Sequence, residues 1–241
     1  MKLHVLGRYG PYPAPGGACS GYLLEQNKTR LLVDCGSGTF SRLLKIADFD
    51  DIDAVFLSHL HADHMADLLI MRYAKDIRKR PLAVYAPQTP AGMFGLLAGE
   101  ALFDVRPVSD GMRVRSGDVD VAFCAMTHPV ESYAMRFTCG DEALVFSGDT
   151  NRNERLGPFA AGASLLLCDA ALLERDRTPG KDYPHLTARE AGRIAAQAGV
   201  QRLALTHLRP AHAAAEYETE AAAEYPGAFA VEEEKTYEIR G

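Results

Sequence analysis

The segment His59-Leu60-His61-Ala62-Asp63-His64 constrains the possible fold more than any other part of the sequence. It places three imidazoles and one carboxylate directly after the apolar run Ala54–Ser58, which is typical of a buried strand. His59 and His61 are two residues apart, so they cannot share a helical face, and we expect both on the loop after the strand. The carboxylate and the third histidine then begin the next helix, where they can point to a second metal ion. The alternative is a polar surface loop, but so dense a set of metal ligands favours a metal site.

Other potential ligands also follow apolar strands. Because strand ends are rigid and adjacent within a sheet, side chains that follow them can converge on one point. Taken singly, a histidine here could lie in an ordinary loop, and an aspartate after glycine could belong to a turn. Taken together, they predict one site built from distant parts of the chain: His128, Asp149, Asp169 and His207.

Strands and helices alternate along the whole sequence without a repeat or linker, so we expect one α/β domain spanning residues 1–241. The best-marked helix is Ala188–Ala198, since Thr187 and Glu190 form a capping box and Gly199 ends it. We also expect a long helix from Met65 to Arg78. The pattern does not decide between one sheet and two.

The composition is that of a soluble globular protein, with 47% hydrophobic and 24% charged residues. No apolar stretch approaches the roughly 20 residues needed to cross a bilayer, and no signal peptide is recognisable, so we expect a cytoplasmic protein without a membrane partner. The five cysteines contain no CxxC pair and are expected to be reduced. The net charge of −6 argues against a long nucleic acid as partner.

The HxHxDH pattern after an apolar strand resembles the metallo-β-lactamase fold superfamily. Within it, the chain is most similar to the ribonuclease Z-like branch, and closest to short bacterial metal-dependent hydrolases or cyclic nucleotide phosphodiesterases. The resemblance runs in order along nearly the whole chain. It rests on Leu6-Gly7, Asp34-Cys35-Gly36-Ser37-Gly38, Thr127-His128, Ser147-Gly148-Asp149-Thr150, Cys168-Asp169-Ala170, His185-Leu186-Thr187-Ala188 and Thr206-His207.

The resemblance implies a four-layer αβ/βα sandwich with two divalent metal ions at one edge. Zinc suits nitrogen and oxygen ligands best, with manganese or iron as alternatives. Asp149 would bridge both ions. By position, the first ion would be held by His59, His61 and His128, and the second by Asp63, His64 and His207.

The same resemblance implies hydrolysis of a phosphate ester. Two metal ions would activate the attacking water, and Asp63 would accept or relay its proton. His185 would protonate the leaving oxygen while Asp169, where the family usually has Glu, fixes its tautomer. Weaker candidates for contacts to a substrate phosphate are Ser132, Arg136 and Arg209.

Ribonuclease Z proper carries a tRNA-gripping arm between the mid-chain histidine and the bridging aspartate. Asp149 follows His128 by only 21 positions here, which leaves no room for an arm. We therefore expect a small phosphodiester, such as a cyclic nucleotide or short oligonucleotide. The alternatives are a tRNA 3′-processing endoribonuclease, a thioester or lactone hydrolase, and a non-enzymatic scaffold on the same fold. A homodimer is suggested by the resemblance alone.

Overall fold

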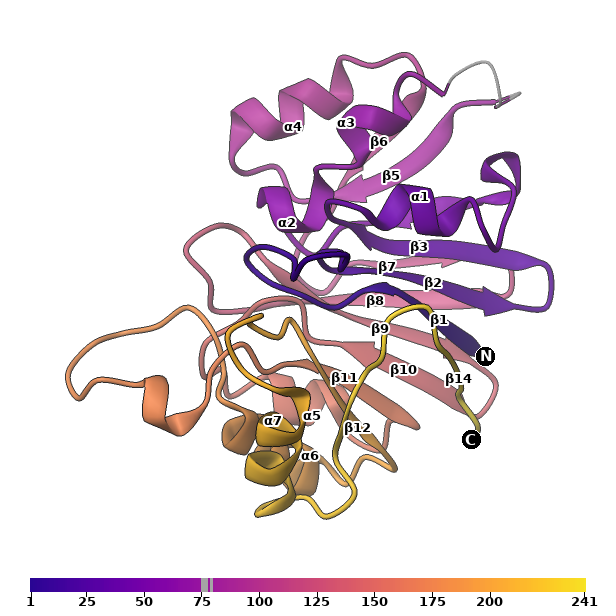
Figure 1. Cartoon of the computed structure of the whole chain (residues 1–241). Coiled ribbons are helices and arrows are strands. Elements are labelled where there is room, and N and C mark those ends of the chain that lie inside the picture. Colours follow the sequence, from indigo (N-terminus) through magenta and orange to yellow (C-terminus); the bar gives the residue numbers. More distant parts are fainter. Residues whose placement is uncertain (75–77, 79) are drawn as a thin grey trace.

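The computed structural model describes residues 1–74, 78 and 80–241, and its two halves each contain a seven-stranded sheet (Figure 1). In the first sheet the strands β14, β1, β2 and β3 pair antiparallel, and β3 to β6 pair parallel. Its strands, in spatial order, are β14 (Thr236–Glu238), β1 (Lys2–Gly7), β2 (Gly21–Gln26), β3 (Thr29–Cys35), β4 (Ala54–Phe56), β5 (Leu82–Ala86) and β6 (Phe103–Pro107).

The second sheet repeats this arrangement. Its strands β7 to β10 pair antiparallel, and β10 to β13 pair parallel. Parallel pairing aligns the carboxyl ends of neighbouring strands at one edge of each sheet. The strands, in spatial order, are β13 (Phe229–Ala230), β12 (Leu203–Thr206), β11 (Leu165–Asp169), β10 (Glu142–Phe146), β9 (Tyr133–Cys139), β8 (Val119–Ala125) and β7 (Arg113–Ser116).

Helices cover the outer face of each sheet, so the layers follow the order α/β/β/α, and the expected αβ/βα sandwich is confirmed (Figure 1). On the first sheet these are α1 (Thr39–Leu43), α2 (Ala62–Met65), α3 (Leu68–Met71) and α4 (Ala91–Ala98). On the second they are α5 (Leu156–Ala160), α6 (Ala188–Ala198) and α7 (Ala214–Ala222). Short 3₁₀ turns occur at η1 (Phe49–Asp51) and η2 (Glu174–Asp176).

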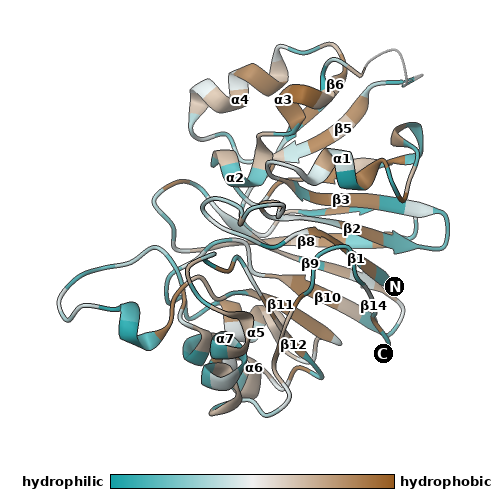
Figure 2. Ribbon diagram, viewed as in Figure 1, coloured by the Kyte–Doolittle hydropathy of each residue, from teal (hydrophilic) through white to brown (hydrophobic). Residues whose placement is uncertain are grey.

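The inner faces of the two sheets meet in an aromatic core. Phe56 of β4 packs edge-to-face on Phe137 of β9, with ring centres 5.7 Å apart, and stacks on Tyr85 at 4.7 Å. Tyr22 of β2 packs against Phe146 of β10 at 5.3 Å. Figure 2 shows the strands as predominantly hydrophobic and the loops as largely hydrophilic. This core fixes the two sheets relative to each other, and with them the strand ends that carry the polar residues.

The helix α6 has the predicted bounds. The Thr187 hydroxyl accepts from the Glu190 amide at 3.2 Å, the Glu190 carboxylate accepts from the Thr187 amide at 2.9 Å, and Gly199 has a left-handed φ of 61°. These reciprocal bonds satisfy amides that a helix start leaves free. The reading of Thr187 and Gly199 as helix boundaries is therefore confirmed.

The prediction of one long helix from Met65 to Arg78 is wrong, because the chain forms the short helices α2 and α3 instead. The Asp67 amide donates to the Cys35 carbonyl at 3.1 Å, and the Asp67 carboxylate accepts from the Phe40 amide at 2.8 Å. These bonds to the β3–α1 segment replace the bond that would have continued the helix. Residues 75–77 of the expected helix lie outside the described residues. The strands β7, β13 and β14 and the helix α5 were not predicted.

None of the helices formed by the described residues has the length and apolar character that crossing a membrane requires.

Replacing Phe56 with alanine tests the aromatic core between the sheets. Phe56 is fully buried, so Phe56→Ala should lower the free energy of unfolding by about 3–5 kcal/mol, as a large cavity does. Urea unfolding of metal-free protein measures this. Ile70→Ala, at a side chain that is 59% exposed, is the control and should cost about 0.5 kcal/mol or less. An equal cost for both variants would contradict the assigned core.

Candidate metal centre

The polar residues that follow five strands lie together at the edge where the two sheets meet. His59 follows β4 of the first sheet, whereas Asp149 and His207 follow the parallel strands β10 and β12 of the second. Asp169 is the last residue of β11, and His128 lies on the connection between β8 and β9. The site is thus built from both sheets, and its geometry depends on the packing between them.

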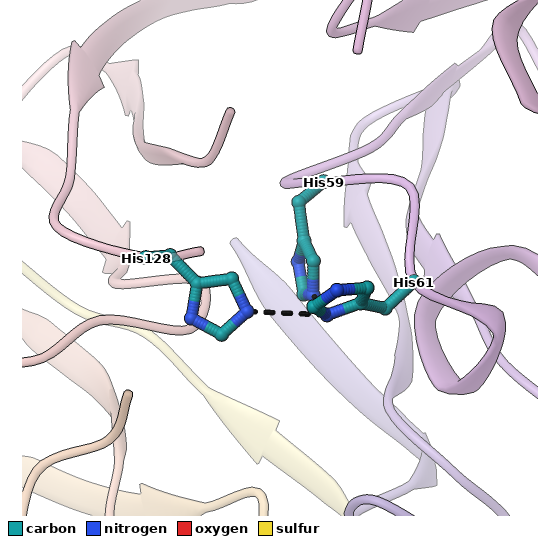
Figure 3. Close-up of side chains that lie close together, drawn as sticks. All are labelled: His59, His61 and His128. Atoms are coloured by element: carbon teal, nitrogen blue, oxygen red, sulfur yellow. Dashed lines mark hydrogen bonds between the residues drawn. The ribbon is translucent and has the colours of Figure 1, made fainter. Parts of the chain in front are cut away.

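Three histidines form the first cluster (Figure 3). The His61 Nδ1 atom lies 3.0 Å from His59 Nε2 and 3.1 Å from His128 Nε2. His61 precedes α2 in an extended conformation, as expected for a loop position, so its ring reaches back toward His59. Three imidazole nitrogens from two segments of the chain therefore converge on one point.

Asp63, His64, Asp149 and His207 form the second cluster. The His207 Nε2 atom lies 3.1 Å from Asp63 Oδ2 and 3.2 Å from Asp149 Oδ2. His64 Nε2 lies 3.3 Å from Asp149 Oδ1. The Oδ2 atom of Asp149 is also 3.6 Å from His59 Nε2 of the first cluster, so the Asp149 carboxylate lies between the two sets.

The second cluster contains polar atoms that the described residues leave without hydrogen-bond partners. These are His64 Nε2, Asp149 Oδ1 and His207 Nδ1, all of them buried. An unpaired buried polar atom lowers the stability of the folded protein. His64 Nε2 and Asp149 Oδ1 in particular therefore indicate groups arranged to bind a ligand. Nitrogen and carboxylate oxygen atoms are the donors that zinc and similar divalent ions take. The two clusters therefore fit two divalent metal ions.

The protonation states of His59 and Asp149 suit metal binding. Burial, reinforced by the charge of His64, holds the pKa of His59 well below its usual value. Burial alone would raise the pKa of Asp149, but His207, His64 and His59 together hold it well below its usual value. A neutral imidazole and an ionised carboxylate are the forms that bind metal.

Asp34, which the sequence pattern did not single out as a site residue, orients His64. Its buried carboxylate accepts from His64 Nδ1 at 2.7 Å, from the Ser58 amide at 2.7 Å and from the Ser58 hydroxyl at 2.8 Å. The bond to Nδ1 places the proton there and leaves the His64 Nε2 lone pair facing Asp149. Asp34 ends the apolar part of β3, so the strand-end pattern that singled out Asp149 could also have found it.

His128 is oriented in the same way by a main-chain group. Its Nδ1 donates to the Pro184 carbonyl at 3.2 Å, which leaves Nε2 for the first cluster. Pro184 belongs to the segment between β11 and α6 that projects from the molecule (Figure 1). The Asn151 side chain donates to Asp182 of this segment at 2.7 Å. These two bonds join the projecting segment to His128 and to Asn151, which lies two residues after Asp149.

His185 lies beside the second cluster and contacts Asp169 directly. Its Nδ1 atom is 3.0 Å from Asp169 Oδ2, and its ring centre is 4.9 Å from that of His207. The Thr150 amide donates to the same Asp169 oxygen at 3.2 Å. Burial disfavours a charged His185, but Asp169 and then Asp149 outweigh it and raise its pKa to about 9. Asp169 is therefore long enough to make the predicted contact with His185.

The structure brings together all of the main predicted site residues: His59, His61, Asp63, His64, His128, Asp149, Asp169, His185 and His207. Among the weaker candidates, the Ser132 hydroxyl donates to the Asp149 carbonyl at 3.0 Å and so supports the centre. Arg136 does not reach it, because its guanidinium donates to the Phe159 and Ala161 carbonyls. For Arg209, the structure records no bond between its side chain and the centre. All five cysteines are free thiols, as expected.

Comparisons of the sequence and of the structure with known proteins identify the same family. The family described as "Beta-lactamase superfamily domain" matches residues 29–208. The probable metallo-hydrolase YhfI of Bacillus subtilis is 34% identical over 215 residues, which cover 86% of this chain and 87% of that protein. The crystal structure of YhfI superposes with a TM-score of 0.92 at 30% identity and covers 98% of both chains.

More distant similarities are to ribonuclease Z proteins. Ribonuclease Z of Haloferax volcanii is 26% identical over 273 residues, covering 89% of this chain and 86% of that protein. The short form of human tRNase Z has the same fold, with a TM-score of 0.81 at 19% identity, and the alignment covers 100% of both chains.

The Asp34–His64 contact leads to a prediction about metal affinity. In Asp34→Asn, the side chain would keep one acceptor oxygen and gain an NH₂ group, which cannot accept hydrogen bonds. It could then no longer accept from the Ser58 amide, the Ser58 hydroxyl and His64 Nδ1 together, so the tautomer of His64 would no longer be fixed. We expect the affinity for Zn²⁺ to fall on the order of 10–100-fold, as for other residues that orient metal ligands. Competition with a fluorescent chelator measures this.

Asp120→Asn is the matched control for this experiment, since Asp120 is exposed on β8 and pairs only with Arg115 among the residues described. It should retain the zinc affinity of the unmodified protein. Unchanged affinity in Asp34→Asn would show that the contact does not orient His64.

Proposed function

Because this chain belongs to the β-lactamase superfamily, in its ribonuclease Z-like branch of metal-dependent hydrolases, we propose that it is a phosphodiesterase for small phosphodiesters such as cyclic nucleotides or short oligonucleotides. Two divalent ions, which we propose to be zinc, would be held by His59, His61 and His128 and by Asp63, His64 and His207, with Asp149 between them. When bound, such ions activate water and neutralise charge on phosphate oxygens.

The observation that carries the proposal is the contact between His185 and Asp169. The carboxylate accepts from Nδ1, so the His185 Nε2 atom is left to hold the proton that can be donated. Asp169, with Asp149, raises the pKa of this imidazole to about 9, which favours its protonated form at neutral pH. A protonated histidine beside the metal cluster is suited to a leaving group that needs a proton.

The departing alkoxide of an ordinary phosphodiester is such a leaving group. It is strongly basic, so its departure is slow unless a proton reaches the oxygen. The thiolate released from a thioester is much less basic and gains little from an acid. The His185–Asp169 pair therefore favours phosphodiester hydrolysis over the thioester alternative, although the fold accommodates both.

Asp63 is the residue best suited to accept the proton of the attacking water. Its carboxylate is partly exposed, and one oxygen is 3.1 Å from His207 Nε2. Burial raises its pKa, but His64 and His207 outweigh this effect and lower it. Asp63 is therefore ionised at neutral pH and can accept or relay a proton.

The restriction to small substrates is supported by the connection between His128 and Asp149. Its residues are all described, and they form β9, β10 and short turns, without an inserted arm. The net charge of −6 also disfavours a polyanion. A tRNA 3′-processing activity is therefore the weaker alternative. The cytoplasmic location and the homodimer remain predictions.

Leaving-group dependence tests the role of His185. With bis(p-nitrophenyl) phosphate, whose leaving group departs without a proton, His185→Ala should lower kcat less than tenfold. With a cyclic nucleotide or dinucleotide, it should lower kcat by about 10²–10⁴-fold, because acid catalysis is lost. Steady-state rates on the metal-loaded enzyme measure both.

His4→Ala is the control for this experiment, because His4 is also partly buried and paired with a carboxylate, Glu25, but lies on β1. Its rates should match those of the unmodified enzyme. If His185→Ala lowered kcat by the same factor on both substrates, a proton donor at this position would be excluded. Hydrolysis of a thioester or lactone, with no phosphodiester turnover, would overturn the proposed function.

A further inference from the structure

Gly10, in the loop after β1, lies against the ring of His207. A Cβ atom on Gly10 would lie 1.9 Å from His207 Nε2, 2.2 Å from Cε1 and 2.4 Å from Cδ2, far inside contact distance. Gly10 does not have a left-handed backbone conformation, so space rather than φ explains why glycine is needed here. The atom nearest to the missing side chain is the nitrogen that faces Asp63 and Asp149.

The His207 ring cannot move aside without leaving its partners. It is 2% exposed, and Nε2 is 3.1 Å from Asp63 Oδ2 and 3.2 Å from Asp149 Oδ2. Its other nitrogen, Nδ1, is 3.8 Å from Asp169 Oδ1. A methyl group on Gly10 would therefore displace the ring from the second cluster.

The main chain around Gly10 cannot easily retreat either. The Gly10 amide donates to the Leu208 carbonyl at 3.3 Å, and the Leu208 amide donates to the Arg8 carbonyl at 2.9 Å. Tyr9 pairs with both Cys19 and Leu208. Because Leu208 directly follows His207, these bonds fix the separation between Gly10 and the histidine through the backbone.

We propose that Gly10 is a positioning residue for the second metal ion, and that segment 8–10 closes the centre on the side of His207. The proposal rests on the two-metal centre proposed above. Because Gly10 has no side chain, His207 Nε2 can stay next to Asp63 and Asp149, while segment 8–10 covers the His207 ring. His61, His128 and His185 are only partly buried, so a substrate reaches the centre from their side, next to the proton donor.

Zinc binding to Gly10→Ala tests the proposal without reference to catalysis. The unmodified protein should take up two equivalents of Zn²⁺. In Gly10→Ala the affinity for one equivalent should fall on the order of 10–100-fold, as when a ligand loses its orientation. The equivalent held by His59, His61 and His128 should be retained. Chelator competition and elemental analysis measure both.

Gly157→Ala is the matched control, because a Cβ at Gly157 in α5 would meet nothing within 4 Å. It should bind two equivalents with unchanged affinity. If Gly10→Ala also bound two equivalents of Zn²⁺ with unchanged affinity, the proposal would be overturned.

A stability cycle in metal-free protein separates a local clash from general damage. Gly10→Ala should lower the urea midpoint in the unmodified background. In the His207→Ala background it should cost little, because the methyl group then occupies the space of the missing ring. An equal cost in both backgrounds would mean that the methyl group acts elsewhere, and the proposal would fail. Neither measurement depends on the substrate, so a failed phosphodiesterase assay would leave this result intact.

Discussion

The Asp149 carboxylate is buried at the edge where the two sheets meet, and the candidate metal centre is arranged around its charge. An isolated ionised carboxylate in such a position would be strongly destabilising. His59 and His64 approach it from the first sheet and His207 from the second, at 3.2–3.6 Å. Their positions depend in turn on Asp34 and on segment 8–10, neither of which belongs to the two clusters. Two bound metal ions would neutralise the remaining negative charge of the Asp149 carboxylate.

The fold supplies the rigidity that such a centre needs. Each sheet places parallel strand ends at one edge, and the aromatic core around Phe56 and Phe137 locks the two edges together. The proposed proton donor is held differently, since His185 lies on the connection between β11 and α6. Asp169 and the helix cap at Thr187 fix the end of that connection. The proposed metal ligands and the proposed proton donor are therefore supported by separate elements that meet at Asp169.

Much of the site could be predicted from the sequence because the expected metal ligands and Asp169 follow a local rule: each comes at or just after an apolar strand, or within one ligand-rich segment. His185 follows no strand, and only the family resemblance singled it out. The helix α6 was equally predictable, since its cap and its end are encoded within a few residues. The number of sheets was not, because pairing between distant strands leaves no local pattern. The break between α2 and α3 depends on bonds from Asp67 to another segment. Gly10 was missed for the same reason: its requirement comes from His207, far along the chain.

The most direct test of the central claim is anomalous diffraction at the zinc absorption edge from crystals grown with zinc. We predict two peaks. One should lie among His59, His61 and His128, the other among Asp63, His64 and His207, and both should be within bonding distance of Asp149. A single peak, or strong peaks only at other positions, would contradict the two-metal centre and every step derived from it.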